Sequence, residues 1–541
     1  MPIIDTGDFF MYRRTAIAYF SLMLVFGVLI VNIFLIIVSQ NAVPSSQRYS
    51  TSALSLSESR GVIYDCNMQR LTGCEAEAVT VCLPDIDAVK AVSSYLADSE
   101  KTLLSENFTD GKISILHPDI NFNSQKVKTV NICKRYGENP LCVHIIGHLD
   151  ENGDGALGLE KAYNSYLKLY SGSLKAVWSR DALGHILGGA GVDFESDGYN
   201  NSGGIQITID SRIQRVVENA LKEQGIDCGA AVVMNAETAE VLALASAPVF
   251  DPSKPGDYLK KENSPFLNRA ITPYSVGSVF KTFVAAAALE KGVTLDYQCR
   301  GSVNVGGTEF RCSGGTVHGQ VNLDGAAQKS CNCYFIELGQ QTGKESLLSL
   351  CSALGFGKST ELADNFILKG GALPQSGELD SPQALSNLCF GQGRLTISPV
   401  KMAAAYSAVA NGGIYHEPTL MKSLIDENRI TVQRVQLPEG VRVMSRDTAK
   451  RLDKMLLSVV TDGNGKRAYS EITENRGKTA TAQSGTYENG REINHTWFCG
   501  YFTFGGNTYT AVILKEDGVS GSVDCAPVFK AISEGIAQIF S

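Results

Sequence analysis

The chain has 541 residues, of which 44% are hydrophobic and 19% are charged, and its formal net charge is −8 at pH 7. This length exceeds one ordinary hydrophobic core, so we expect at least two globular domains. The negative charge and the lack of a sustained run of lysine and arginine disfavour nucleic acid as a partner, because binding to phosphates needs a cationic surface.

An uncharged apolar segment covers residues 15–38. As a helix it is long enough to cross roughly 30 Å of hydrocarbon. Arg13 and Arg14 precede it, so the positive-inside rule predicts a cytoplasmic tail at residues 1–14 and export of the remaining chain. A cleavable signal peptide is the alternative, but the segment is too long and lacks a clear small-x-small cleavage site. We therefore expect a single-pass membrane anchor.

Three composition changes follow the anchor. Residues 39–59 are rich in serine and predict a tether, because this composition cannot bury a core. Residues 60–187 mix short apolar strands with charged turns and predict a mixed α/β domain without a catalytic constellation. Residues 188–204 are rich in Gly, Asp, Asn and Ser and predict a linker to a second domain at 205–541.

The second domain begins and ends with strand and helix patterns. Residues 205–210 predict a strand, and Asp210 or Ser211 can cap the amphipathic helix that follows. Two apolar runs at 230–235 and 240–246 predict an antiparallel hairpin. Further strands at 495–504 and 508–516, and a closing helix at 528–540, repeat the pattern. We therefore expect an α+β fold with an antiparallel sheet sandwiched by helices.

Fourteen cysteines in an exported chain suggest disulfides. Cys299 and Cys312 bracket a Gly-rich stretch that a disulfide would staple as a hairpin, whereas Cys331 and Cys333 alternate as buried small hydrophobes do. The sequence contains no CxxC pair and no zinc-like Cys/His spacing, so we expect no metal site. Which cysteines pair stays open.

Ser278 and Lys281 lie in the first turn of a helix predicted within residues 272–292. Positions three apart share a helix face. A lysine can take the proton of a serine nucleophile if burial or nearby cations lower its pKa from about 10.4. Two other Ser-x-x-Lys pairs, Ser165/Lys168 and Ser398/Lys401, show that the spacing alone is weak evidence, and Ser398 reads better as a helix cap.

Two further motifs support a catalytic role for Ser278 and Lys281. They are Ser330-Cys331-Asn332, and Lys478 followed by Thr479, Ala480 and Thr481. Taken singly, each motif has a structural explanation as a cap, a turn or an edge strand. In this order they resemble the active site of penicillin-binding proteins and serine β-lactamases. The stretches SRGVIYDCN (59–67), GALGLEKAYNSYL (155–167) and FGQGRLTISPVKMAAAYSAVANGG (390–413) narrow the resemblance to class B penicillin-binding proteins.

The resemblance implies a role for each motif residue. Ser278 would be the acylated nucleophile and Lys281 its proton acceptor. Ser330 would relay a proton to the leaving amine, Asn332 would hold Lys281 and the substrate amide, and Lys478 would supply positive charge.

Substrate contacts are implied in the same way for the Lys-Thr strand. Thr479 and Thr481 would bind the substrate carboxylate, and the backbone N–H groups of Ser278 and Thr481 would form the oxyanion hole. Ala480 stands where the family has glycine, but alternation in a strand turns its side chain away from those of its neighbours. Its effect on β-lactam affinity stays open.

The implied fold is a penicillin-binding transpeptidase domain carried on a pedestal domain. Arg60, Asp65, Glu160, Arg180 and Asp181 lie in the pedestal motifs and are interpreted as structural. Cys66 replaces the arginine usual there.

The implied function is a penicillin-binding serine D,D-transpeptidase that cross-links peptidoglycan stem peptides ending in D-Ala-D-Ala, without a cofactor. β-Lactams would inhibit it, and a polytopic SEDS-family polymerase would be its membrane partner in cell-wall synthesis. The alternatives are a D,D-carboxypeptidase, a β-lactam hydrolase or sensor, and a non-catalytic scaffold. A role in elongation and cell shape, in division or in sporulation stays open, as do the acceptor amine and the oligomeric state.

Overall fold

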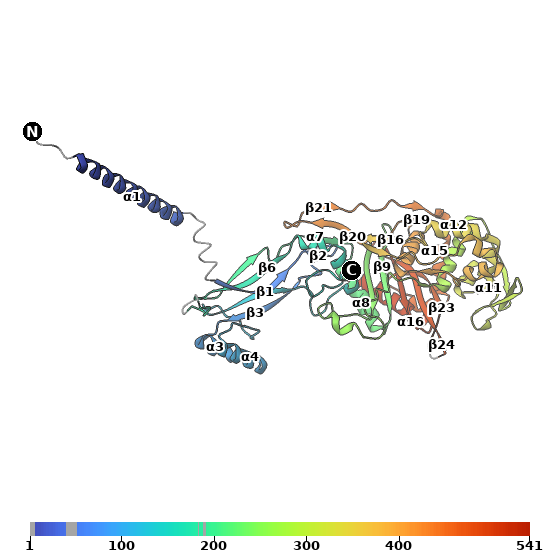
Figure 1. Ribbon diagram of the computed structural model, residues 1–541. Coiled ribbons are helices and arrows are strands. Elements are labelled where there is room, and N and C mark those ends of the chain that lie inside the picture. The colour runs from blue at the N-terminus through green and yellow to red at the C-terminus, as the bar shows by residue number, and fades with distance from the viewer. Residues whose placement is uncertain (1–5, 39–50, 182, 188–190, 489) are drawn as a thin grey trace, which may run out of the picture. The chain divides into compact units, whose positions relative to one another are not determined.

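The computed structural model describes residues 6–38, 51–181, 183–187, 191–488 and 490–541 (Figure 1). The chain forms two compact units: one comprises Met1–Glu58, Ala76–Cys133 and Gly172–Tyr199, and the other comprises Ser59–Glu75, Lys134–Ser171 and Asn200–Ser541. The boundaries predicted from sequence follow the chain order, whereas these units interleave along it.

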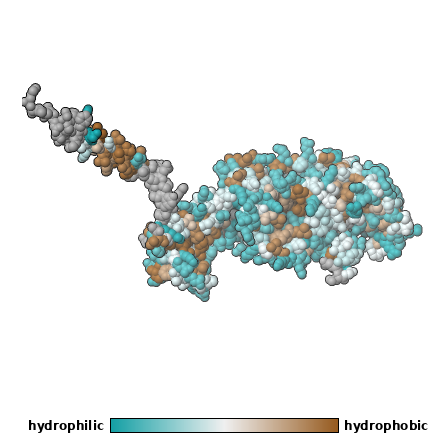
Figure 2. All heavy atoms as spheres, viewed as in Figure 1, coloured by the Kyte–Doolittle hydropathy of each residue, from teal (hydrophilic) through white to brown (hydrophobic). Residues whose placement is uncertain are grey.

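Helix α1 (Thr6–Val38) contains the predicted membrane anchor and begins within the predicted tail. Its segment Arg13–Leu35 has a mean hydropathy of 2.4 and buries none of its side chains, so it is long and apolar enough to cross a membrane. Figure 2 shows the apolar side chains gathered over this helix. Within the predicted tether, residues 51–59 form a strand and residues 39–50 lie outside the described residues.

Besides α1, the described residues of the first unit form two three-stranded sheets and the helices α3 and α4. The sheet orders are β1-β6-β7 and β4-β3-β5. Their bounds are Thr51–Ser59 (β1), Gly172–Ser179 (β6), Asp193–Asp197 (β7), Ser114–Leu116 (β4), Glu75–Cys82 (β3) and Val127–Lys134 (β5), with α3 at Ile86–Ser93 and α4 at Asp98–Thr109. β7 lies within the predicted linker, of which residues 188–190 fall outside the described residues.

A five-stranded antiparallel sheet is the centre of the second unit, in the order β10-β9-β25-β24-β23. The strands are β9 (Gly229–Asn235), β10 (Val241–Ala247), β23 (Glu474–Glu488), β24 (Arg491–Phe504) and β25 (Asn507–Lys515). The predicted hairpin and terminal strands are therefore confirmed. β23 is an edge strand of this sheet, which matters for the site described below.

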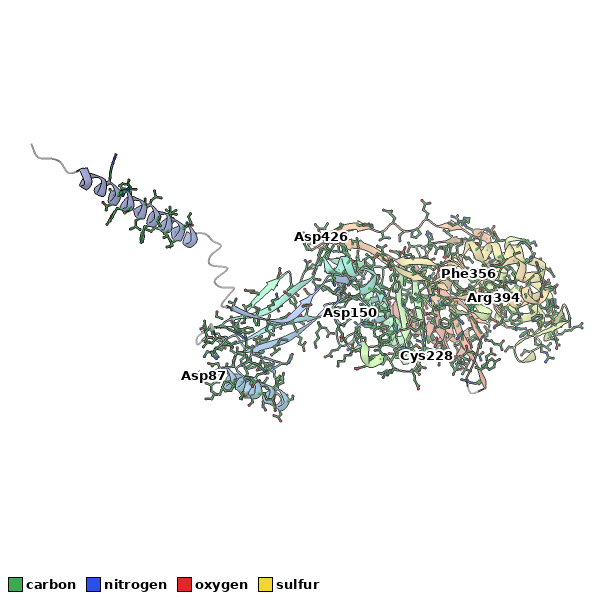
Figure 3. All side chains as sticks on the ribbon, viewed as in Figure 1. Asp87, Asp150, Cys228, Phe356, Arg394 and Asp426 are labelled. Carbon is green, nitrogen blue, oxygen red and sulfur yellow. The ribbon has the colours of Figure 1, made fainter. Side chains whose placement is uncertain are left out.

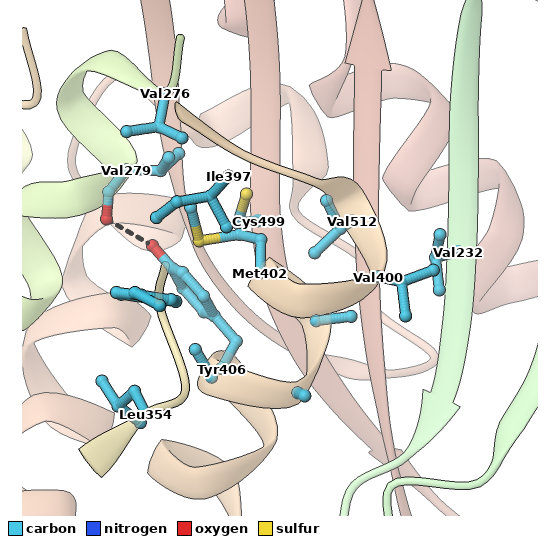
Figure 4. Close-up of a cluster of buried hydrophobic side chains, with 14 of the residues drawn as sticks. Val232, Val276, Val279, Leu354, Ile397, Val400, Met402, Tyr406, Cys499 and Val512 are labelled. Atoms are coloured by element: carbon cyan, nitrogen blue, oxygen red, sulfur yellow. Dashed lines mark hydrogen bonds between the residues drawn. The ribbon is translucent and has the colours of Figure 1, made fainter. Parts of the chain in front are cut away.

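Helices cover both faces of this sheet, as the sequence predicts. Helices α8 (Ser211–Glu223) and α17 (Ala526–Phe540) pack on one face, where Val233, Phe498 and Phe529 are buried together. Alternate residues of the same strands, such as Val232 and Cys499, face the cluster that includes α9 (Lys281–Glu290) and α14 (Pro399–Ala410) (Figure 4).

Helix α9 is buried on every side rather than on one face, because residues 281–288 are all buried. Its first turn contacts other buried rings: Phe283 meets Phe356, which is labelled in Figure 3, with ring centroids 5.4 Å apart. The other helices of this region are α10 (Leu323–Gln328), α11 (Asn332–Thr342), α12 (Lys344–Ala353), α13 (Pro382–Cys389) and α15 (Arg446–Thr461). A central helix therefore holds the candidate nucleophile segment.

Smaller sheets complete the second unit. In a four-stranded sheet, β2 (Val62–Tyr64) pairs in parallel with β8 (Gly204–Ile207), and β20 (Met421–Ile425) and β21 (Thr431–Arg434) follow. The β2–β8 pairing explains why residues 59–75 group with the C-terminal part of the chain. A two-hairpin finger contains β12 (Tyr297–Cys299), β13 (Ser302–Val305), β14 (Thr308–Arg311) and β15 (Gly319–Val321).

Candidate active site

Ser278 lies in a single 3₁₀ turn, Gly277–Phe280, that continues directly into α9. Side chains three apart nearly eclipse in such a turn, which puts Ser278 and Lys281 on one side. Gly277 has φ +59°, and a Cβ there would lie 3.0 Å from Cβ of Ala482 and 3.1 Å from the carbonyl oxygen of Thr481. The nucleophile turn therefore passes closely along β23, an approach that only glycine permits.

Buried contacts with α14 fix the position of this turn. The Tyr406 hydroxyl on α14 donates a hydrogen bond of 2.9 Å to the carbonyl oxygen of Val279 (Figure 4) and lies 2.9 Å from the hydroxyl of Thr282. Val279 and Tyr406 have no exposed surface. The position of Ser278 is thus set by packing on both sides of its turn.

The Lys281 ammonium contacts the Ser330 turn. Its Nζ donates to the carbonyl oxygen of Ser330 (2.8 Å), to Ser330 Oγ (3.3 Å) and to Asn332 Oδ1 (2.7 Å). Lys281 is fully buried, and this burial lowers its pKa to about 8 against the smaller opposite effect of nearby cysteine sulfurs. Among the described hydrogen bonds, those of Lys281 Nζ go to this turn rather than to Ser278.

Lys478 approaches the same hydroxyl from β23. Its Nζ donates to Ser330 Oγ (3.0 Å) and to the carbonyl oxygen of Thr479 (3.0 Å). Burial, and next the positive charge of Lys281, hold the pKa of Lys478 well below its usual value. Two buried lysines beside one hydroxyl repel each other when both are charged, so the arrangement favours a neutral amine at this site.

Ser330 itself has a backbone conformation rare for serine, with φ +53°. Such left-handed residues cost roughly 1–3 kcal/mol and concentrate at functional sites. Asn332, two residues after Ser330, is anchored to the finger, because its Nδ2 donates to the carbonyl oxygen of Arg311 at 3.0 Å. Contacts from three elements therefore maintain this turn.

One cleft of about 1140 Å³ is lined by five of the predicted site residues, while Lys281 and Lys478 are buried and reach the Ser330 hydroxyl by hydrogen bonds. Its lining includes Ser278, Ser330, Asn332, Thr479 and Thr481. Because β23 is an edge strand, backbone polar groups on its outer side lack a neighbouring strand and can bind an extended ligand.

Ala480 contributes to the cleft lining but is only 3% exposed, in the cluster that also contains Trp497. Its methyl group is thus accommodated in the core. Thr479 Oγ1 donates to Asn464 Oδ1 at 3.1 Å. Sequence reasoning missed Asn464, and the only available signal was its place in a polar turn, DGNGK, before the strand.

The two decoy Ser-x-x-Lys pairs have structural partners. Ser398 Oγ accepts from the backbone N–H of Lys401 (3.3 Å) as the cap of α14, and Lys401 Nζ pairs with Glu417 (2.8 Å). In the other pair, Lys168 Nζ lies 2.5 Å from the Asp154 carboxylate.

The pedestal residues also contact structural partners. Glu160 is buried between Arg60 (3.4 Å) and Arg135 (2.6 Å), and Asp65 accepts from the hydroxyl of Ser211 (2.7 Å). Burial, and next the charge of Asp210, raises the pKa of the Cys66 thiol to about 12, which leaves it protonated in place of the family's arginine. In the first unit, Asp181 accepts from the backbone N–H of His185 (2.8 Å) in a turn with Arg180.

The fold brings together a Cys/His group that the spacing along the chain did not indicate. Cys299, Cys312, His318 and Cys331 converge beside the cleft, with ligand atoms all within 4.8 Å of one another. The spacing of these residues along the chain matches no short motif, because the β13–β14 hairpin lies between Cys299 and Cys312 and β15 and α10 lie between His318 and Cys331. The Cys299 and Cys312 sulfurs lie 3.8 Å apart as thiols, so the proposed staple is not formed here.

Residues 229–534, more than half of the chain, match the penicillin binding protein transpeptidase domain. The chain is 29% identical to stage V sporulation protein D of Bacillus subtilis over 456 residues, covering 78% of this chain and 69% of that protein. It is 32% identical to penicillin-binding protein PbpB of Mycolicibacterium smegmatis over 440 residues, covering 75% of this chain and 64% of that protein. The fold and site define a serine acyltransferase of the penicillin-binding type.

The chain therefore belongs to the penicillin-binding protein transpeptidase family, in the class B group that the motifs indicated. Other relatives are named peptidoglycan D,D-transpeptidases, and this is the enzyme class of the chain. A solved chain described under "Structural coordination of polymerization and crosslinking by a peptidoglycan synthase complex" has a TM-score of 0.69 and 24% identity, covering 97% of this chain and 98% of its own. That likeness confirms the fold.

Proposed function

We propose that the chain cross-links peptidoglycan stem peptides through an acyl-enzyme on Ser278. The observation that supports this most is the convergence of two buried lysines, Lys281 and Lys478, on Ser330 Oγ beside Ser278 in one cleft. A scaffold has no use for two lysines whose pKa values burial lowers.

In the acylation step, neutral Lys281 takes the proton of Ser278 while Oγ attacks the carbonyl carbon of the penultimate D-Ala. The proton passes through Ser330, whose hydroxyl lies 3.3 Å from Lys281 Nζ, to the nitrogen of the terminal D-Ala. The C–N bond breaks and D-Ala leaves. An amine of a neighbouring stem then attacks the ester, returns the proton to Ser278 and forms the cross-link.

Substrate binding uses the edge of β23. The peptide lies beside the strand, with its terminal carboxylate at Thr479 and Thr481 and near the amine of Lys478. The backbone N–H groups of Ser278 and Thr481 stabilise the oxyanion, a donor pair in which each N–H is worth about 10²–10³ in rate. Asn332 orients Lys281 and the substrate amide.

The cell-wall substrate lies outside the cytoplasm, so α1 anchors the chain with its N-terminus in the cytoplasm. Arg13 and Arg14 at the start of the apolar segment support this orientation. The partner is a polytopic SEDS-family glycan polymerase, since the chain carries a cross-linking site and the solved neighbour belongs to a synthase complex.

A D,D-carboxypeptidase would use the same acyl-enzyme with water as the acceptor. In the described part of the chain, the outer edge of β23 pairs with no other strand, which favours a peptide acceptor because this edge offers binding length beyond the acyl donor.

The test is intact mass spectrometry of the full chain in detergent after incubation with a penicillin. One penicillin adduct on the wild type, none on Ser278→Ala and a full adduct on the exposed decoy Ser165→Ala would support the nucleophile. An adduct on folded Ser278→Ala would overturn it. Cross-linked dimers from a stem pentapeptide, rather than tetrapeptide alone, would separate the transpeptidase from the carboxypeptidase.

A further inference from the structure

The Cys/His cluster beside the cleft has the dimensions of a tetrahedral metal site. The sulfur of Cys312 lies 3.8 Å from that of Cys299 and 3.7 Å from that of Cys331, and the Cys299 sulfur lies 3.5 Å from Nδ1 of His318. Zinc–sulfur bonds of about 2.3 Å and zinc–nitrogen bonds of about 2.0 Å place tetrahedral ligands roughly 3.5–3.8 Å apart. These three distances thus match the edges of a zinc tetrahedron, and all four ligand atoms lie within 4.8 Å of one another.

Backbone groups around the cluster favour thiolates. The Gly301 N–H donates to the Cys299 sulfur (3.4 Å), and the Tyr334 N–H donates to the Cys331 sulfur (3.5 Å). Cys331 is also the N-cap of α11, an eleven-residue helix whose N-terminus favours negative charge. All three cysteines are buried, with 2% exposure or less.

We propose that Cys299, Cys312, His318 and Cys331 bind one zinc ion. Three thiolates and one imidazole are soft and borderline ligands, which select zinc over magnesium or calcium. Binding displaces the thiol protons to solvent and leaves a buried site with one net negative charge instead of three uncompensated thiolates.

A fifth donor lies next to the site. The Cys333 sulfur is 3.5 Å from that of Cys312. We assign the fourth position to His318, because its Nδ1 falls within the mutual ligand distances of the other three whereas Cys333 is outside that set. Cys333 is then a spare thiol in contact with the site.

The site joins the two-hairpin finger to the Ser330 turn. Cys331 stands between Ser330 and Asn332, and Cys312 follows Arg311, whose carbonyl oxygen accepts from Asn332. Ser330 needs external support because of its left-handed backbone. The zinc ion therefore acts as a positioning element for the hydroxyl and amide that contact Lys281; this consequence rests on the proposed function, whereas the metal site does not.

The first experiment measures zinc in the full chain, purified in detergent with a reductant and without metal affinity resin or chelator. We expect one zinc per chain by elemental mass spectrometry. Replacement by Co²⁺ should produce thiolate charge-transfer bands and the strong visible bands of tetrahedral cobalt. Folded protein without zinc that also fails to take up Co²⁺ would overturn the proposal, as would a Cys312–Cys331 disulfide in metal-free protein that persists under reductant.

Variants identify the ligands. Cys299→Ser and His318→Ala should each lose the zinc or the cobalt bands, whereas Cys333→Ser should keep both. The matched control is Cys228→Ser, because Cys228, labelled in Figure 3, is half-buried, lies just before β9 and is not one of the grouped ligands. Zinc retained by His318→Ala and lost by Cys333→Ser would overturn the assignment of the fourth ligand.

The positioning role is tested by removing zinc from the wild type with a chelator. The limiting rate of penicillin acylation should fall about 10–100-fold, the range typical of groups that orient a site, with unchanged circular dichroism and with recovery on adding Zn²⁺. Unchanged acylation in zinc-free protein would overturn the positioning role. An absent adduct in zinc-loaded protein would instead count against the proposed function.

Discussion

Two buried lysines with the same sequence spacing from a serine differ in what surrounds them. Lys281 and Lys401 both have no exposed surface, and burial is the largest cause lowering the pKa of each. Lys401 pairs with the Glu417 carboxylate at 2.8 Å, which opposes the effect of burial. The described hydrogen-bond partners of Lys281 are neutral oxygens of Ser330 and Asn332. Glu417 thus stabilises Lys401 in its charged form, whereas the surroundings of Lys281 favour a neutral amine that can act as a base.

The largest expected difference between the two lysines is the effect of removing each amine on the acylation rate. Lys281→Met should lower the rate of penicillin acylation by about 10²–10⁴-fold, the usual worth of a general base. Lys401→Met should leave that rate within about threefold, because the described hydrogen bonds of its amine go to Thr360, Tyr415 and Glu417. Stopped-flow acylation of both variants measures the difference. Equal losses in the two would refute the distinct role of Lys281.

The pH dependence should separate the two lysines next. The pKa of Lys281 is lowered to about 8, so acylation should rise about tenfold per pH unit below that value and level off above it. Between pH 6 and 8 the increase is about 50-fold, because half of the amine is neutral at pH 8. A flat rate over this range in folded protein would contradict a titrating base at this site.

The free energy of unfolding should instead depend on the ion pair between Lys401 and Glu417. Burial raises the pKa of the Glu417 carboxyl, but hydrogen bonding from Lys401 opposes this effect and the pKa stays below its usual value. The stabilisation is therefore present above the unfolded pKa, near 4.3, and is lost as pH falls through the lower folded value.

Glu417→Gln should destabilise the fold by about 1–3 kcal/mol, less than the 3–5 kcal/mol of fully buried pairs because the Glu417 side chain is 37% exposed. Denaturation midpoints of wild type and variant test this, and the acylation rate of the folded variant should not change. Wild-type stability in the variant would show that Lys401 is held by its hydroxyl partners alone.

Ala480→Gly should have the smallest effect. The methyl group is 3% exposed within the core, so restoring the family's glycine should change acylation by less than about threefold. The added backbone freedom in a strand should cost roughly 0.5–1 kcal/mol. A large gain in acylation rate would show that the methyl group crowds the ligand.

The sequence predicted much of the sheet and of the site for identifiable reasons. Strands at 230–235 and 240–246 carry continuous apolar runs, and Ser398-Pro399 is a strong helix start, so local pattern and tertiary structure agree there. The interleaving of the two units along the chain was not predictable, because it depends on the pairing of β2 with β8, whose residues are about 140 positions apart. Asn464 was missed because one asparagine in a polar turn has no distinguishing pattern.

By itself, the sequence determined the apolar N-terminal helix that fits a membrane anchor, the sheet covered by helices and the order of the three motifs, since these depend on composition and on residues close along the chain. Only the tertiary structure decided which Ser-x-x-Lys pair has a lysine without a carboxylate partner. It also decided that Cys299, Cys312, His318 and Cys331 meet, because burial, pKa and ligand geometry arise from groups that distant segments bring together.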